Sequence, residues 1–135
     1  MRLRLIQAIA LLCLSSGLAF GQLSGITLST SPNPSVVNNN VTMTASLNPP
    51  AAGVTIEFDD VTVTPFTNLG TAATNASGVA TIFVSSLSVG THRIRAQYNT
   101  GNVIVVSNTV SQVVNNPPPP SLSLTSNPNP SNVGQ

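Results

Sequence analysis

The sequence is poor in charged, sulfur-containing and aromatic residues. Only 5% of its 135 residues are charged, tryptophan is absent, and the single cysteine is Cys13. Two of the four basic residues, Arg2 and Arg4, stand at the N-terminus. The remainder of the chain has no basic patch with which to neutralise a row of phosphates, so we predict no nucleic-acid partner.

The N-terminus has the pattern of an export signal. Arg2 and Arg4 precede an apolar run over residues 5–14, and Ala19 and Gly21 place small residues before a cleavage point. We therefore predict a signal peptide over residues 1–21 and a secreted or cell-surface protein. The apolar run is too short for a transmembrane helix, so no membrane span is expected in the mature chain. Cys13 would leave with the signal, and a lipoprotein signal would need a smaller residue than Leu12 before it.

An internal repeat sets the expected domain organisation. Residues 30–35 (Thr-Ser-Pro-Asn-Pro-Ser) return at 126–131 as Ser-Asn-Pro-Asn-Pro-Ser, and the offset is 128 − 32 = 96 residues. This period fits a small β-sandwich domain better than a solenoid repeat. We predict one complete domain over residues 24–115, a proline-rich linker over 116–120, and the first strand of a truncated second copy over 121–135. The chain is then expected to be a fragment of a tandem array, with its last segment unpaired or paired with a free sheet edge.

Apolar and polar residues alternate with a period of two along most of the chain, which is typical of β-strands. The prolines at positions 32 and 34 predict a sheet edge or a change of sheet, and Asp59-Asp60 predicts a turn. About seven short strands and no helix indicate an all-β protein, an antiparallel β-sandwich. The expected strands cover residues 26–31, 41–47, 54–58, 66–72, 79–84, 91–98 and 103–114.

Three segments carry a resemblance to a known family. They are residues 28–35 leading into 41–45, residues 54–59, and residues 75–81 continued to His92. Over about residues 24–114 the chain resembles the bacterial immunoglobulin-like repeat family. The resemblance implies an immunoglobulin-like sandwich with Greek-key connections. It also implies neighbouring repeats of the same kind as partners, but no particular ligand.

The only histidine, His92, is predicted to be structural. It stands where sandwich domains often place a tyrosine that bonds the backbone across a corner between strands. A metal site or a general base would need a second histidine, a cysteine or a nearby acid, and the acids belong to a different strand and turn. A serine nucleophile would lack the same partners. We therefore predict no catalytic residue, no cofactor and no enzymatic activity.

The acids Glu57, Asp59 and Asp60 are neighbours and form the best candidate for a calcium site. Turn formation and solvation explain them more simply. Arg93 and Arg95 are expected on one face of a strand. There they would pair with Glu57 across the sheet or discourage the addition of further strands.

The leading functional hypothesis is a non-enzymatic exported module, a structural spacer or adhesion unit of a tandem-repeat protein. Its partners would be neighbouring repeats and a cell-surface protein or glycan. The alternative is a carbohydrate-binding accessory domain of a secreted hydrolase. Sugar binding usually requires exposed aromatic rings. With no tryptophan and with Tyr98 expected to point inward, this alternative ranks second.

Overall fold

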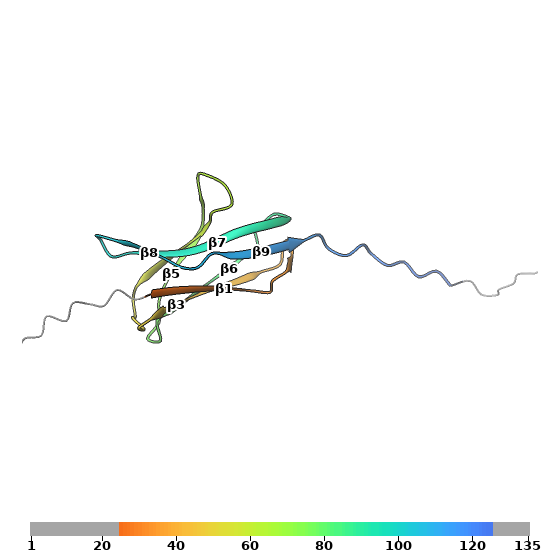
Figure 1. The fold of residues 1–135 in the computed structure, drawn as a ribbon. Coiled ribbons are helices and arrows are strands. Elements are labelled where there is room, and N and C mark those ends of the chain that lie inside the picture. The colour runs from red at the N-terminus through yellow and green to blue at the C-terminus, as the bar shows by residue number, and fades with distance from the viewer. Residues whose placement is uncertain (1–24, 126–135) are drawn as a thin grey trace, which may run out of the picture.

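A computed structural model describes residues 25–125, which form nine strands and no helix (Figure 1). The strands are β1 (Gly25–Ser31), β2 (Ser35–Val36), β3 (Val41–Asn48), β4 (Thr55–Asp60), β5 (Thr67–Ala73), β6 (Val79–Val84), β7 (Gly90–Asn99), β8 (Ile104–Val106) and β9 (Val110–Asn115).

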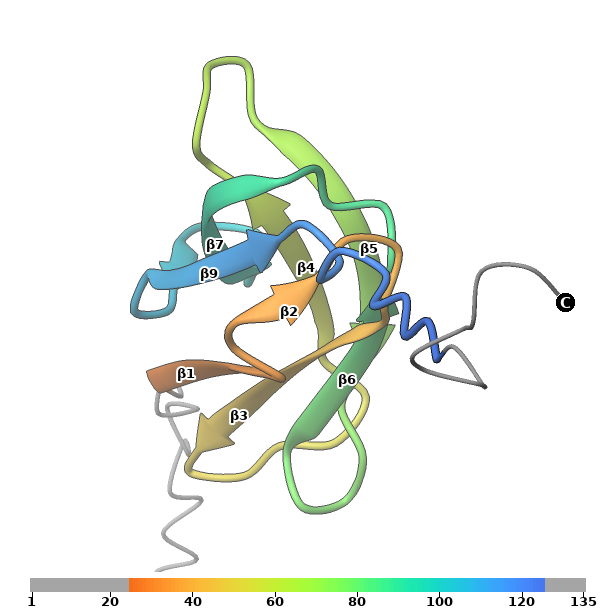
Figure 2. The same cartoon turned by 90° about the vertical axis from the view of Figure 1, so that its right-hand side faces the viewer.

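The strands build two sheets that face each other (Figure 2). The small sheet has the order β1-β3-β6, and the large sheet has the order β2-β9-β7-β4-β5. Strands β8 and β9 both pair with β7, β8 with its end and β9 with its beginning. All pairs are antiparallel except β2 with β9, which is parallel. The chain crosses between sheets after β1, β2, β3, β5 and β6, so the predicted all-β sandwich is confirmed.

The core lies between the sheets and follows directly from the alternating sequence. In β3 the apolar side chains face inward, and the threonines and serine between them face outward. Strands β4 and β7 contribute the centre of the opposite layer, where Phe58 and Ile94 are fully buried. Tyr98 belongs to the buried set, as predicted. No cysteine lies in the described part of the chain, so burial and strand pairing hold the two layers together.

A proline corner carries the chain from the small sheet to the large one. Residues 32–34 separate β1 from β2, as the prolines predicted. The side chain of Asn33 fixes the corner to β9: its amide donates to Ser111 O at 2.8 Å, and its carbonyl accepts from Val113 N at 3.0 Å. The buried Gln112 side chain donates to Pro32 O at 3.0 Å. These bonds satisfy backbone groups that the prolines leave without a ladder partner.

The structure differs from the predicted strands mainly in three places. Asp59 and Asp60 do not begin a turn but complete β4, because β5 and β7 pair with both residues. The predicted last strand is divided into β8 and β9. At the division Ser107 Oγ accepts from Ala96 N at 2.9 Å, and the Asn108 side chain bonds both Leu28 N and Leu28 O. The two-residue strand β2 was not predicted, since so short a segment shows no alternation.

Residues 116–125 follow β9 outside any strand and lead away from the sandwich (Figure 1). Leu122 and Leu124 are 94% and 90% exposed. The predicted signal peptide over residues 1–21 and the last part of the predicted second copy, residues 126–135, lie outside the described residues.

Candidate functional site

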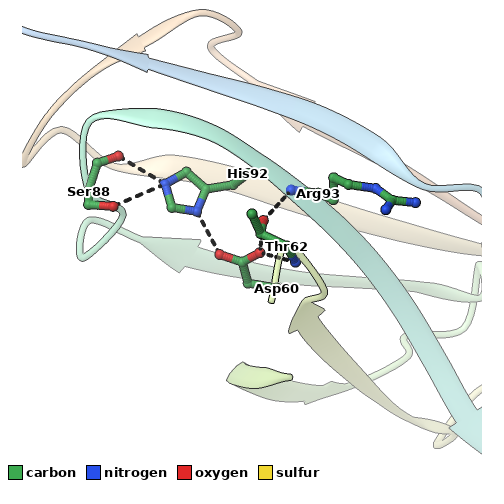
Figure 3. Close-up of polar contacts among 5 residues, drawn as sticks. All are labelled: Asp60, Thr62, Ser88, His92 and Arg93. Carbon is green, nitrogen blue, oxygen red and sulfur yellow. Dashed lines mark hydrogen bonds and ion pairs between the residues drawn. The ribbon is translucent and has the colours of Figure 1, made fainter. Parts of the chain in front are cut away.

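The most connected polar cluster joins the end of β4 to the beginning of β7 (Figure 3). Asp60 is the last residue of β4 and pairs with Ile94 of β7, which brings its carboxylate beside His92. His92 Nδ1 lies 2.6 Å from Asp60 Oδ2. Among residues 25–125 this is the only ion pair. The expectation that the acids lie too far from His92 is therefore wrong. The reason is that β4 runs two residues further than predicted.

The other ring nitrogen of His92 contacts the backbone, as predicted. His92 Nε2 is 2.9 Å from Ser88 O and 3.4 Å from Ser88 Oγ. Asp60 and the Ser88 carbonyl are both acceptors, so the ring satisfies both when each nitrogen carries a proton. Burial disfavours the charged ring, but the hydrogen bonds to Asp60 and Ser88 outweigh it and raise the pKa of His92 above 6.5.

Thr62 completes the cluster. Its backbone N–H donates to Asp60 Oδ1 at 2.9 Å, its hydroxyl donates to the same oxygen, and that hydroxyl accepts from Arg93 N at 2.8 Å. Burial alone would raise the pKa of Asp60, but the bonds from Thr62 and His92 lower it below 3.8. The cluster thus fixes the start of the β4–β5 loop, residues 61–66, against β7 (Figure 3).

Ser88, His92 and Asp60 stand in the order of a hydrolytic triad, but the protons are in the wrong places for that chemistry. A general base needs a lone pair that faces the serine hydroxyl. Here the short contact of Nε2 is with the Ser88 carbonyl, so Nε2 is a donor, and Ser88 Oγ stands further away at 3.4 Å. In this geometry the three residues form a structural clamp.

The histidine clamp predicts a pH-dependent stability. The pKa of His92 is higher in the folded state than the value of 6.5 expected in the unfolded chain. The charged ring therefore makes its full contribution to the stability of the fold when the pH is below 6.5. That contribution is lost as the pH rises through the folded value. We expect the free energy of unfolding to fall as the pH rises from about 6 through the folded-state pKa of His92, because the ring then loses its charge-assisted hydrogen bonds to Asp60 and Ser88.

Urea-unfolding midpoints measured across this range would reveal the slope. His92→Gln is the informative variant, because the chain has no other histidine. The slope should disappear in that variant. An equal slope in the wild type and the variant would contradict the assignment.

The structure separates the three predicted calcium ligands. Glu57 and Asp59 alternate with the buried Phe58 and lie on the outer face of the large sheet, whereas Asp60 is turned toward His92. Within residues 25–125, no three His, Cys, Asp or Glu side chains are grouped so as to hold a metal ion. Calcium binding by Glu57, Asp59 and Asp60 stays a prediction.

On the outer face, Glu57 is held by two amides. Its Oε1 accepts from Asn68 Nδ2 at 2.6 Å and its Oε2 accepts from Gln97 Nε2 at 3.2 Å. The expected pairing of Glu57 with Arg93 or Arg95 is wrong: among residues 25–125 neither arginine forms an ion pair with Glu57, and the two amides bond its oxygens instead. Arg95 instead donates to Gln97 Oε1 at 3.3 Å and stacks on the Phe66 ring, 5.1 Å from the ring centroid.

Asp59 is only 3% exposed although it faces outward. Burial is the main cause that raises its pKa above 3.8. The nearby charge of Glu57 adds to the effect, and Arg95 and Asn68 partly oppose it. Asp59 Oδ2 and Arg95 Nε are buried without a hydrogen-bond partner. This carboxylate–amide–guanidinium network was not predicted, although the alternation along β4 and β7 placed its members on one face.

Next to this network lies an open cavity of about 340 Å³. Its lining residues come from four strands and are Thr55, Glu57, Thr71, Gln97, Tyr98, Asn99 and Ile104. The outer face of the large sheet therefore carries both a hydrogen-bonded polar network and a hollow.

Comparison with known proteins agrees with the observed fold. Seven chains of known structure match the fold. One is a marsupial T cell receptor, with a TM-score of 0.50 and 13% sequence identity. The match covers 70% of this chain and 54% of the receptor chain, so this chain spans about half of its length. No curated protein sequence matches the chain. At this identity the likeness concerns the fold alone, which is an immunoglobulin-like β-sandwich.

The sequence match is more specific. The family model described as bacterial Ig-like domain (group 3) matches residues 28–115, most of the described part. The chain belongs to this family, as its resemblance predicted. Members are generally non-catalytic and are often extracellular or surface-associated, which indicates a structural or adhesion module. Among residues 25–125 no helix has the length and apolar character needed to cross a membrane.

Proposed function

We propose that this chain is a non-enzymatic, exported Ig-like module that acts as a spacer or adhesion unit in a tandem-repeat protein. The signal pattern over residues 1–21 supports export. The observation that carries the tandem arrangement is the repetition of β1 and its proline corner 96 residues later.

The environments of the two copies of this segment support the proposal. Ile26 and Leu28 in β1 are buried against the core, whereas their counterparts Leu122 and Leu124 are almost fully exposed. A pair of apolar side chains two residues apart is the pattern that a strand needs when one of its faces meets a core. Leu122 and Leu124 therefore have the sequence of a core-facing strand but no core beside them in the described residues.

The connection between copies would be short and stiff. Residues 117–120 are four consecutive prolines, which favour an extended polyproline conformation. Strand β1 begins at one end of the sandwich and β9 ends at the other (Figure 1). Modules joined in this way would follow one another in a line, and the array would gain reach with each copy.

A two-module chain tests this function. Gln135 corresponds to residue 135 − 96 = 39, so residues 40–115 are appended after Gln135. We expect the added segment to fold with residues 121–135 as its first strand. Small-angle scattering should then show two beads in a line, and the unfolding enthalpy should be about twice that of one module. A second half that remains unfolded would contradict the proposal.

Matched double variants test whether Leu122 and Leu124 are the core-facing residues of the second module. Leu122→Asn with Leu124→Asn places polar side chains at the two core positions and should abolish folding of the second module. Ser123→Asn with Thr125→Asn changes the positions equivalent to the exposed Thr27 and Ser29 and should leave it folded. If both double variants destabilise the second module equally, the strand register assigned to residues 121–125 is wrong.

A carbohydrate-binding accessory domain remains the second candidate, and one observation favours it. Phe66 is an aromatic ring, 51% exposed, on the outer face of the large sheet, where it stacks on Arg95. The expectation that the fold presents no ring for a sugar considered only tryptophan and tyrosine.

A further inference from the structure

The outer face of β4, β5, β7 and β8 has the geometry of a small rigid binding site. Glu57 is opposite Thr71 of β5 and Gln97 of β7, and Asn99 is opposite Ile104 of β8. Strand pairing therefore fixes the spacing of these side chains. The cavity of about 340 Å³ falls at the lower end of the range for small-molecule sites. Sites on paired strands are held more closely than sites on loops.

The polar groups of the cavity offer both donors and acceptors. Asn68 and Gln97 orient the Glu57 carboxylate, and each of its oxygens keeps further capacity to accept. The Thr55 and Thr71 hydroxyls line the same hollow, where each can donate and accept. Asn99 Oδ1 accepts from Gly101 N at 2.7 Å, so the side-chain amide of Asn99 offers its N–H groups as donors. Such a mixture suits a ligand whose own groups both donate and accept.

The charge of the cavity narrows the class of ligand. Glu57 is the only charged residue in its lining, so a phosphate or sulfate would meet a like charge and no cation. An apolar ligand would take the Glu57 carboxylate out of water and offer it no hydrogen bond beyond those from Asn68 and Gln97. Sugar hydroxyls satisfy the carboxylate and amides, and the C–H surface of a sugar ring can rest on Ile104, which is exposed.

Phe66 extends the site beyond the cavity. Gln97, at the cavity wall, accepts a hydrogen bond from Arg95, and the Arg95 guanidinium lies on the Phe66 ring. The ring is therefore held on the same face as the hollow and remains half exposed. The flat apolar face of the ring can stack on the C–H face of a second sugar unit next to the one in the hollow.

We propose that this face binds a neutral oligosaccharide. Glu57, Thr71 and Gln97 hydrogen-bond the hydroxyls of one unit in the cavity, and Phe66 stacks on a neighbouring unit. The inference deepens the carbohydrate-binding candidate and rests on it. It is independent of the tandem arrangement, since the two-module experiment does not involve this face.

Nuclear magnetic resonance titration of the 15N-labelled mature chain tests the proposal. The probes are soluble β-1,4-glucose, α-1,4-glucose and N-acetylglucosamine oligomers, with n-butylammonium and inorganic phosphate as charged comparisons. For at least one oligomer we expect saturable shifts at the amides of Glu57, Thr71 and Gln97, with a Kd on the order of 1 mM. If no oligomer produces saturable shifts there up to about 20 mM, the proposal fails. It also fails if butylammonium or phosphate binds there more tightly than every oligomer.

Variants on exposed strand positions supply the controls. Thr71→Val removes one hydroxyl and should weaken binding about fivefold, and Glu57→Gln should weaken it at least as much. Thr81→Val makes the same change on the exposed face of β6 and should leave binding unchanged. Phe66→Ala should weaken binding of an oligomer but not of its single sugar unit. If Thr71→Val and Thr81→Val bind equally well, the cavity is not the site.

Discussion

Replacing Phe58 with alanine is expected to lower the free energy of unfolding by about 3–5 kcal/mol. Phe58 is fully buried in β4, a central strand that pairs with both β5 and β7. The chain has only five aromatic residues and no tryptophan, so little else can fill the space that this ring would leave. Domains of this size are stable by about 5–15 kcal/mol in total, so the variant should be marginally folded.

Urea unfolding at constant pH measures this loss, with Phe83→Ala as the matched control. Phe83 has the same side chain on β6 but is 70% exposed, so its removal should change stability by no more than about 0.5 kcal/mol. Equal losses in the two variants would mean that the buried layer is not where the structure places it.

Replacing Gly78 with alanine should destabilise the domain for two separable reasons. Gly78 has a φ of +72°, and an added Cβ would lie 2.8 Å from Pro50 Cα and 3.1 Å from Ala51 N. The left-handed backbone costs a non-glycine residue about 1–2 kcal/mol, and the close contacts require the neighbouring backbone to shift. We expect a total loss of about 2–5 kcal/mol.

Gly53→Ala measures the cost of the left-handed backbone alone. Gly53 has nearly the same φ, +75°, and an added Cβ would meet nothing within 4 Å. In thermal unfolding its midpoint should fall by about 5–10 °C, and that of Gly78→Ala should fall further. If the two variants melt at the same temperature, the contact with Pro50 has no energetic consequence.

The sequence predicted the sandwich well because a strand buried on one face is a local pattern. The alternation in β3 identifies its four inward residues without knowledge of any partner strand, and the predicted limits of β6 agree with the structure. The turn over residues 75–78 was also predictable. There the Asn75 side chain accepts from both Ser77 N and Val79 N, and the glycine supplies the left-handed residue.

The site was not predictable in the same way, because its contacts join residues distant in sequence. His92 and Asp60 are 32 residues apart, and only the pairing register of β4 with β7 brings them together. The division between β8 and β9 depends on Asn108 bonding Leu28, 80 residues away. The exposure of Phe66 and its contact with Arg95 follow from the β4–β5 loop, which has no repeating pattern to interpret.

The parallel pairing of β2 with β9 has a mechanical consequence. Because β1 begins at one end of the sandwich and β9 ends at the other (Figure 1), a pull on the two ends of the domain would act along the paired strands β2 and β9. The ladder bonds and the contacts of Asn33 and Val37 with β9 cross this boundary and share the load side by side. They must break together rather than one after another. Each module in a stretched chain would therefore resist opening until these bonds yield.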